Sequence, residues 1–501
     1  MYQAIAATRV VDVAFYCPAV PGNCLPCGDP IQASAASRLQ GHLRRVEKPM
    51  NHAIKIMAPG HEALTQNTRF QVYTERQLDK IRPLERFTKE QRFEMHVVAN
   101  VLPFRVNQYV IDELIDWNNI PADPVFQLTF PQRNMLEPED FERMAEALRR
   151  DAQRSEIQAI AVDIRSKLNP HPAGQQEMNV PVFHGEPLPG TQHKYRETVL
   201  FFPSQGQVCH SYCTFCFRWA QFIGDKELRF ASNEAGNLHK YLAGHKDVTD
   251  LLMTGGDPMV MKTHHLKAYL EAMLRPALEH VQNIRIGTKS LTFWPQRYVT
   301  DEDAHELLAL LERLVKAGKH VALMAHFNHW REMDTPIVRE AVRRIRAAGV
   351  VIRAQAPIVR NINDDPAVWA KMWRTQVGMG IIPYYMFVER DTGAKRYFEV
   401  PLERTYQIYR EAIQQVSGLA RTVRGPSMSA GPGKVEIQGI VELNGEKIFI
   451  LRFIQGRNPD WVQRIFFAKY DPEATWFDDL KPAFGEEKFF FTDEYNAMQG
   501  V

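Results

Sequence analysis

The hydrophobic positions of this chain change their spacing twice along the sequence. From about residue 74 to residue 167 they recur at helical spacing, which predicts amphipathic helices. We assign this helical region to residues 71–190, and we assign the irregular, proline-rich residues 1–70 before it to an extended arm. The predicted helices cover Gln91–Leu102, Tyr109–Ile115 and Asp140–Leu148, the last of them opened by Glu137-Pro138.

A second rhythm begins near residue 197, where short apolar runs alternate with amphipathic helical stretches. Six successive β/α units favour a parallel sheet with helices on its outer face, either open and doubly wound or curled towards a barrel. Because six units are fewer than the eight of a closed barrel, we predict an α/β fold with a partial (β/α)6 barrel over residues 191–420. The predicted strands are Val199–Phe202, Val248–Met253, Ile284–Gly287, Val321–Ala325, Val350–Gln355 and Ile381–Val388. The predicted helices lie at about 232–243, 263–279, 302–316, 336–347, 366–376 and 403–416.

The pattern changes again beyond Gly418, and we assign residues 421–501 to a C-terminal extension. A segment rich in glycine, proline and serine comes first. Two apolar strands follow, Val435–Leu443 and Lys447–Ile454, and the Asn444-Gly445 pair between them is a strong signal for a β-hairpin turn. The aromatic and acidic tail after the hairpin is assigned no role.

Composition and charge exclude several classes of function. The 61 Lys and Arg residues nearly balance the 59 Asp and Glu residues, so no overall field draws the chain to nucleic acid or to an anionic membrane. No apolar run reaches the roughly 18 residues that a membrane span requires, and the opening residues lack the pattern of a secretory signal. We therefore expect a cytoplasmic protein that acts on a small molecule.

The six cysteines fall into two groups of three, and the second group carries the strongest chemical signal. Cys209, Cys213 and Cys216 lie directly after the first predicted strand. Three converging thiolates can hold three irons of a 4Fe–4S cluster and leave the fourth iron open to a ligand. The alternatives are buried thiols or a structural zinc, although zinc would want a fourth ligand that His210 is too close in sequence to supply.

The first group consists of Cys17, Cys24 and Cys27. Their spacing matches no metal motif, they lie in the proline-rich arm, and no further cysteine exists to complete a site. We interpret them as free reduced thiols, with a second metal site as the alternative.

The CxxxCxxC spacing, with an aromatic residue before the last cysteine, resembles the motif of the radical SAM superfamily. Taken with other stretches, it makes the chain similar to the lysine 2,3-aminomutase family across about residues 195–440, and more loosely over Asn100–Leu136. The matching stretches are Cys209–Arg218, Thr254–Pro258, Arg285–Thr288 with Pro295–Arg297, His326–His329, Gln355 with Asn363-Asp364, Pro383–Tyr385 and Gly431–Lys434.

The resemblance implies a radical enzyme that uses a 4Fe–4S cluster, S-adenosylmethionine and pyridoxal 5′-phosphate (PLP). In the family, one electron, which we expect a reductant protein to deliver, leads to a 5′-deoxyadenosyl radical that abstracts a β-hydrogen from an amino acid joined to PLP as an imine. The expected enzyme is therefore an isomerase, an amino-acid 2,3-aminomutase that converts an α-amino acid to a β-amino acid. Two alternatives stay open: radical chemistry on another PLP-bound amine without migration, and a protein with a structural metal at the triplet.

The resemblance also assigns roles to individual residues. Gly255, Gly256 and Asp257 follow the second predicted strand, where glycines let backbone approach a ligand and the carboxylate can accept the ammonium of S-adenosylmethionine. Lys434 matches the lysine that bonds to PLP. A lysine suits this role because a desolvated amine is a nucleophile. Pro432 interrupts the glycine run that the family has at this point.

Three further residues match family positions that bind substrate or PLP. Arg218 matches the arginine that grips the substrate carboxylate, a task suited to a planar, two-pronged donor. Gln355 and, across a two-residue difference in spacing, Tyr195 match positions that contact PLP. The family holds its oligomers with a zinc on late cysteines, but no cysteine follows Cys216, so any homo-oligomer here must be held otherwise.

The positions that would recognise the substrate side chain depart from the family. Lysine-specific members present two aspartates to the distal ammonium, and the same positions here hold Arg390 and Ser427. A lysine ammonium facing a guanidinium in a water-poor pocket would meet like-charge repulsion. We therefore predict an acidic or neutral substrate, with glutamate first. A one-residue gap would instead place Asp391 there, with Glu389 close by, and would favour an amine.

Overall fold

The computed structural model describes residues 69–169, 178–223 and 230–500. These residues belong to one compact unit, Pro59–Val501. The arm predicted for residues 1–70, and with it Cys17, Cys24 and Cys27, falls almost wholly outside the described ranges. Within those ranges no helix combines the length and hydropathy needed to span a bilayer.

A helical region precedes the main sheet. Thr88 opens α1 with a capping box, since its hydroxyl accepts the N–H of Gln91 and the Gln91 side chain accepts the N–H of Thr88. Where a helix was expected over Tyr109–Ile115, the structure has a single π turn, Val110–Leu114, because the chain turns back at Asp116 towards α2. The elements are β1 (Val72–Thr74), α1 (Lys89–Val101), β2 (Arg105–Asn107), α2 (Pro124–Thr129), α3 (Pro138–Arg149) and α4 (Arg154–Leu168).

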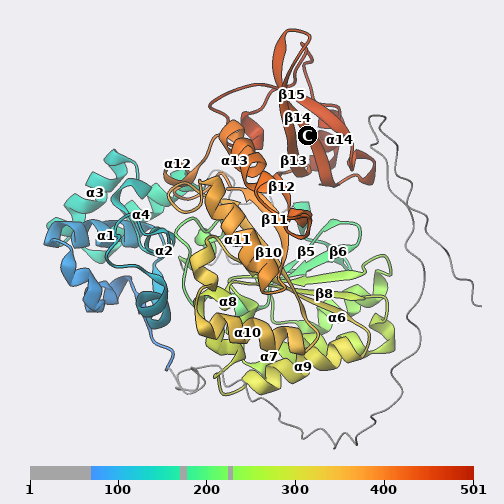
Figure 1. Ribbon diagram of the computed structural model, residues 1–501, viewed down its shortest axis with the longest axis horizontal. Helices are drawn as coiled ribbons and strands as arrows, with labels where there is room; N and C mark the ends of the chain where they lie inside the picture. Colours follow the sequence, from blue (N-terminus) through green and yellow to red (C-terminus); the bar gives the residue numbers. More distant parts are fainter. Residues whose placement is uncertain (1–68, 170–177, 224–229, 501) are drawn as a thin grey trace, which may run out of the picture. The chain divides into compact units, whose positions relative to one another are not determined.

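An eleven-stranded sheet forms the centre of the fold (Figure 1), in the order β15-β14-β13-β12-β11-β10-β9-β8-β7-β6-β5. All six predicted strands are present as parallel neighbours, and each is followed by its predicted helix. The strands are β6 (Thr198–Phe201), β7 (Asp250–Met253), β8 (Asn283–Thr288), β9 (His320–His326), β10 (Val351–Ile358) and β11 (Ile382–Val388). The helices are α6 (Ala235–Gly244), α7 (Thr263–Leu270), α9 (Ala304–Lys316), α10 (Pro336–Ala347), α11 (Pro366–Gly378) and α13 (Leu402–Gln414), with short α8 (Ser290–Phe293) and α12 (Lys395–Phe398) in loops.

The glycine, proline and serine segment after Gly418 contains a seventh parallel strand, β12 (Arg424–Ser429). Gly425 makes this possible: with φ at 135°, its backbone lies so close to β11 that a Cβ would be 2.2 Å from the Met386 carbonyl oxygen. The predicted hairpin follows, and Asn444 and Gly445 both have positive φ, as its tight turn requires. The remaining elements are β3 (Val182–Phe183), β4 (Glu186–Pro187), β5 (Thr191–Tyr195), β13 (Gly433–Leu443), β14 (Glu446–Gly456), β15 (Ile465–Lys469) and α14 (Thr492–Gln499).

The sheet curls strongly. Strands β5 and β13 are eight steps apart in sheet order, which would be about 38 Å in a flat sheet at about 4.8 Å per step. Lys194 on β5 nevertheless donates from Nζ to the carbonyl oxygen of Ala430, just before β13, at 2.7 Å. Because the ladder of the described strands ends at β5 and β15 without joining them, the fold is a partial barrel.

Candidate active site

The three cysteines of the triplet lie in the loop between β6 and α6, and each is partly exposed. Burial of the thiols raises the pKa of all three, and the pKa of Cys209 is raised further by Asp257, Cys216 and Cys213. A bound metal would deprotonate them, so the three fit the role of cluster ligands.

The described residues contain no group of three His, Cys, Asp or Glu side chains placed to hold a single metal ion. A 4Fe–4S cluster makes a different demand, since each thiolate binds its own iron.

Residues of the helical region are hydrogen-bonded to the cysteine loop. The N–H of Thr214 donates to the carbonyl of Leu128 on α2 at 2.9 Å. Asn107 on β2 is fully buried and donates from Nδ2 to the carbonyls of His210 and Phe293, at 3.3 and 2.7 Å. No sequence motif pointed to Asn107, because its partner His210 is 103 positions away.

The two glycines after β7 lie against the cysteine loop. A Cβ on Gly255, whose φ is 156°, would be 2.4 Å from Nε2 of Gln207, and a Cβ on Gly256 would be 2.6 Å from the backbone nitrogen of Val208. Both positions therefore need glycine for the segment that leads into Cys209. Their predicted contact with S-adenosylmethionine stays a prediction.

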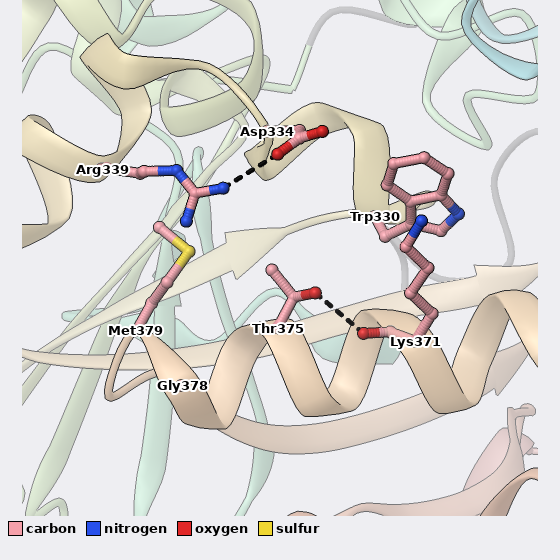
Figure 2. A pocket seen from close by; sticks show the side chains of 7 residues that line it. All are labelled: Trp330, Asp334, Arg339, Lys371, Thr375, Gly378 and Met379. Carbon is pink, nitrogen blue, oxygen red and sulfur yellow. Dashed lines mark hydrogen bonds and ion pairs between the residues drawn. The ribbon is translucent and has the colours of Figure 1, made fainter.

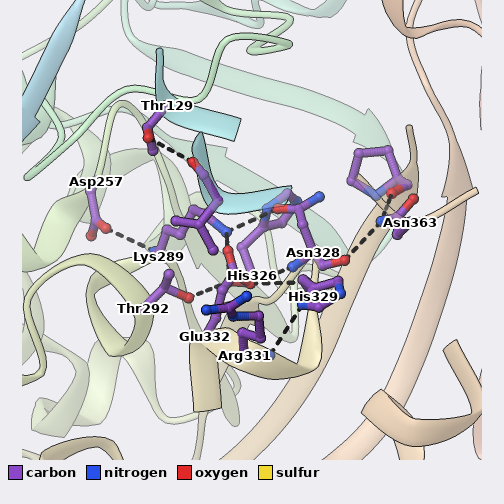
Figure 3. A network of polar contacts seen from close by, with 12 residues as sticks. Thr129, Asp257, Lys289, Thr292, His326, Asn328, His329, Arg331, Glu332 and Asn363 are labelled. Atoms are coloured by element: carbon purple, nitrogen blue, oxygen red, sulfur yellow. Dashed lines mark hydrogen bonds and ion pairs between the residues drawn. The ribbon is translucent and has the colours of Figure 1, made fainter. Parts of the chain in front are cut away.

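Asp257 is buried, and both of its carboxylate oxygens accept hydrogen bonds. Figure 3 shows the one from Lys289. Oδ1 accepts the N–H of Met259 at 2.9 Å and the hydroxyl of Thr288 at 2.7 Å, and Oδ2 accepts the N–H of Lys289 at 2.8 Å. Burial raises the pKa of Asp257 to about 6, although these hydrogen bonds lower it. Asp257 thus ties the loop after β7 to the loop after β8, and a ligand ammonium would have to share an oxygen with these donors.

Arg218 lies two residues beyond the last cysteine. Its guanidinium lies 4.3 Å from the ring centre of Phe202, and one Nη donates to Gln221 at 2.7 Å. Burial lowers its pKa to about 10, while Cys216 and Cys209 favour the charged form. Among the described residues its buried Nε has no hydrogen-bond partner, which leaves one N–H for a bound carboxylate.

Lys434 is the second residue of β13, at the start of a strand rather than within a loop. The β13–β14 register shifts between Lys434 and Val435, an irregularity of the kind that redirects a side chain. Its Nζ lies 4.1 Å from the ring centre of Tyr385 on β11. Burial, together with Arg424 and Arg285, lowers the pKa of Lys434 to about 7, so the neutral amine is well populated near neutral pH.

The other residues matched to PLP positions lie on strands of the same sheet as Lys434. Gln355 on β10 pairs with Tyr385 beside a second register shift, and Tyr195 follows Lys194 on β5. Sequence reasoning missed Lys194. Burial lowers its pKa well below the ordinary value, and Arg457, Arg390 and Lys434 lower it further. A phosphate bound among these mutually repelling cations would relieve the repulsion, so the residues fit PLP.

The two residues expected at the substrate side chain lie close to these groups. The guanidinium carbon of Arg390 lies 5.6 Å from the ring centres of both Phe217, in the cysteine loop, and Trp476, in the tail that had no predicted role. Burial lowers the pKa of Arg390, whereas Asp391 and Asp478 favour its charged form.

Ser427 on β12 is fully buried, and its hydroxyl has no partner within the described ranges. Glu389 is buried as well, and neither of its carboxyl oxygens has a hydrogen-bond partner there. Burial and the nearby Glu399 raise the pKa of Glu389 well above its ordinary value, which favours the neutral acid. Glu389, the residue before Arg390, therefore adds little negative charge to the site.

A separate cavity of about 460 Å³ lies outside this site, between the turn that follows β9 and the end of α11 (Figure 2). Lys371 places its ammonium 3.0 Å from the ring centre of Trp330 at its edge, and Arg339 is paired with Asp334. None of the predicted site residues lines this cavity.

Comparison with known proteins identifies the family to which the chain belongs. No family model matches it. A protein of Aquifex aeolicus provisionally named L-lysine 2,3-aminomutase is 31% identical over 405 residues, which cover 81% of this chain and 95% of that protein. The L-lysine 2,3-aminomutase of Escherichia coli is 28% identical over 48% of this chain and 67% of its own length, and that of Fusobacterium nucleatum is 26% identical over 60% and 65%.

Solved structures with a detectable likeness include a radical SAM methyltransferase from Sphaerobacter thermophilus, with a TM-score of 0.33 and 13% identity over 47% of this chain and 68% of that one. Streptococcus suis SuiB bound to S-adenosylmethionine has a TM-score of 0.32 and 13% identity over 55% and 58%. The identity and coverage of the Aquifex relative decide the family: this chain belongs to the lysine 2,3-aminomutase family.

Proposed function

We propose that this protein is a PLP-dependent radical SAM aminomutase that moves the α-amino group of an acidic or neutral amino acid to its β-carbon, with glutamate as the first candidate. The observation that carries the proposal is the position of Lys434. It is a partly buried amine with a lowered pKa beside strand β11 of a barrel whose first loop holds the cysteine triplet. When bound, the 4Fe–4S cluster, S-adenosylmethionine and PLP would supply the radical and the electron delocalisation that an amino shift needs.

The residues of the chain would bind, orient and shield the reactants. Cys209, Cys213 and Cys216 would hold three irons. The neutral amine of Lys434, covered by the ring of Tyr385, is suited to attack an aldehyde near neutral pH. Arg218 would orient the substrate carboxylate through its unused N–H.

Substrate specificity would depend on the residues that meet the end of the substrate side chain. Arg390 brings a positive charge to the site, Glu389 is disposed to be neutral, and Ser427 offers a buried hydroxyl. A side-chain carboxylate could bind the guanidinium and accept a hydrogen bond from the hydroxyl. A lysine ammonium would lose water and meet the like charge of Arg390, whose charged form Asp391 and Asp478 favour.

A direct test offers glutamate and lysine separately to the anaerobically reconstituted, reduced enzyme and follows β-amino product by NMR. We expect β-glutamate to form, and we expect Arg390→Met to raise the KM for glutamate at least tenfold, while cleavage of S-adenosylmethionine without substrate continues. Preferred turnover of lysine would refute the proposed specificity. Absence of S-adenosylmethionine cleavage at full iron loading would refute the radical function itself.

A further inference from the structure

The turn that leads into Lys434 connects β12 to β13. Residues 430–432 form this turn, and Lys434 pairs with Ser429 across it. The two strands are held by the hydrogen bonds of the sheet, but the turn residues belong to neither strand. Their carbonyl oxygens must find donors in other parts of the chain or in water. The contacts that hold this turn therefore decide where the Lys434 side chain begins.

Arg457 supplies two of the donors. It follows β14 directly, and its Nε donates to the Gly431 carbonyl at 2.9 Å while its backbone N–H donates to the Pro432 carbonyl at 3.0 Å. Lys194 on β5 donates from Nζ to the carbonyl before them, that of Ala430, at 2.7 Å. Three successive carbonyls of the turn are thus bound by β5 and by the residue after β14.

The guanidinium of Arg457 is itself held at its far end. One Nη donates to Oδ1 of Asn179 at 2.7 Å, and Asn179 is buried. The side chain of Arg457 is also hydrogen-bonded to Tyr495 on α14, which lies beside β13 and β14 in Figure 1. Because the guanidinium is planar and has partners on several sides, it cannot swing away from the turn without breaking several hydrogen bonds.

The packing around the turn leaves it little room to shift. A Cβ on Gly431 would be 2.2 Å from the Tyr495 hydroxyl, and a Cβ on Gly433 would be 2.3 Å from the Gln455 carbonyl oxygen. Arg457 and Tyr495 both lie beyond the hairpin, in the tail to which the sequence assigned no role. That tail therefore closes around the turn.

We propose that Arg457 is a positioning residue for Lys434: it fixes the backbone of the turn, so that the lysine presents its amine to the PLP aldehyde in one orientation. The inference rests on the proposed function, because it takes PLP as the partner of the amine. In that reaction the nitrogen bonds to the aldehyde carbon, and the oxygen leaves as water with two protons from the nitrogen. The rate of such a step depends steeply on alignment.

Arg457 acts here through geometry and not through its charge. Burial, Arg424 and Arg285 are what lower the pKa of Lys434. Loss of the Arg457 side chain should therefore change how fast the neutral amine reacts, and not the pH at which the amine becomes neutral. A pH profile separates the two effects.

The test measures the reaction of Lys434 with PLP. The reconstituted protein receives PLP and cyanoborohydride for a short, constant time at a series of pH values, and peptide mass spectrometry measures the label on Lys434. We expect Arg457→Met to lower the high-pH plateau of this curve about tenfold and to leave its midpoint unchanged. Cleavage of S-adenosylmethionine without substrate should continue, because the contacts of Arg457 described above do not involve the cysteine loop.

Arg165 on α4 provides a matched control. Its Nε and one Nη donate to the carbonyls of Val101 and Asn100 at the end of α1, at 2.7 and 3.1 Å. Arg165→Met removes the same kind of contact from another part of the chain and should leave the labelling of Lys434 unchanged. Denaturant unfolding of both methionine variants separates a loss of stability from a loss of position.

Asn179→Ala gives a second test if Arg457→Met does not fold. It releases the far end of the guanidinium and keeps the donor to the turn, so we expect the plateau to fall about threefold. An unchanged plateau in the variant tested, a shifted midpoint at an unchanged plateau, or an equal loss of label in Arg165→Met would each overturn the inference. A wild-type protein that takes up no label on Lys434 would instead defeat the proposed function.

Discussion

Lys434 shows how a single residue acquires reactivity from its surroundings. Its pKa of about 7 lies below the ordinary value of 10.5 because charging the buried amine beside Arg424 and Arg285 is unfavourable. The neutral fraction therefore rises with pH and passes one half near pH 7. We expect the PLP fixed on Lys434 by cyanoborohydride in a short, constant time to follow the same curve, as measured by peptide mass spectrometry.

Lys447 on the same hairpin is the internal control for this experiment. Tyr470 and Glu403 raise its pKa, so its labelling should stay low until much higher pH. Identical pH profiles for the two lysines would show that Lys434 gains nothing from its site.

Residue type and spacing made the cysteine triplet predictable as a candidate. Arg218 and Lys434 became candidates through the resemblance to a known family, which rests on short local motifs. Asn107 and Lys194 were not predictable. Each acts on a partner more than one hundred positions away, His210 for the first and Ala430 for the second, and no local pattern records such a contact.

At the scale of the elements, the turn after β7 requires glycine at positions 255 and 256, and this requirement can be tested. Replacing Gly256 with alanine puts a Cβ 2.6 Å from the Val208 nitrogen, so the backbone leading to Cys209 must move. We expect Gly256→Ala to cost about 1 to 3 kcal/mol of unfolding free energy and to reduce the iron retained after reconstitution. Denaturant unfolding and iron analysis measure the two effects.

Gly236 on α6 provides the matched control, since an added Cβ there meets nothing within 4 Å. Gly236→Ala should retain all its iron and gain up to about 1 kcal/mol. Full iron retention and unchanged stability in Gly256→Ala would contradict the close packing described for this turn.

The β/α elements of the barrel were predictable because short apolar runs and amphipathic helices differ in period. Strand β12 was not, since Gly425, Pro426 and Ser427 have the composition of a loop. They form a strand because β11 offers them a backbone to pair with, which is a property of the tertiary structure rather than of the segment.

At the scale of the whole molecule, the cysteine content predicts one cluster per chain. Cys17, Cys24 and Cys27 lie outside the described residues, and we interpret them as free thiols. Replacing all three with alanine should leave about four irons per chain and unchanged cleavage of S-adenosylmethionine. Alanine at Cys209, Cys213 or Cys216 should abolish that cleavage. Loss of iron in the triple variant, measured by iron and sulfide analysis, would reveal a second metal site.

The curl of the sheet also bears on when the site forms during folding. Lys194 and Ala430, which meet at 2.7 Å, are 236 positions apart, and closing so long a loop costs chain entropy before the contact is gained. Local β/α pairs can form first, whereas the meeting of β5 with the start of β13 waits for the strands between them. A growing chain thus carries the thiols of Cys209, Cys213 and Cys216 long before it carries the amine of Lys434. The complete set of reactive groups exists only once the last strands have joined the sheet.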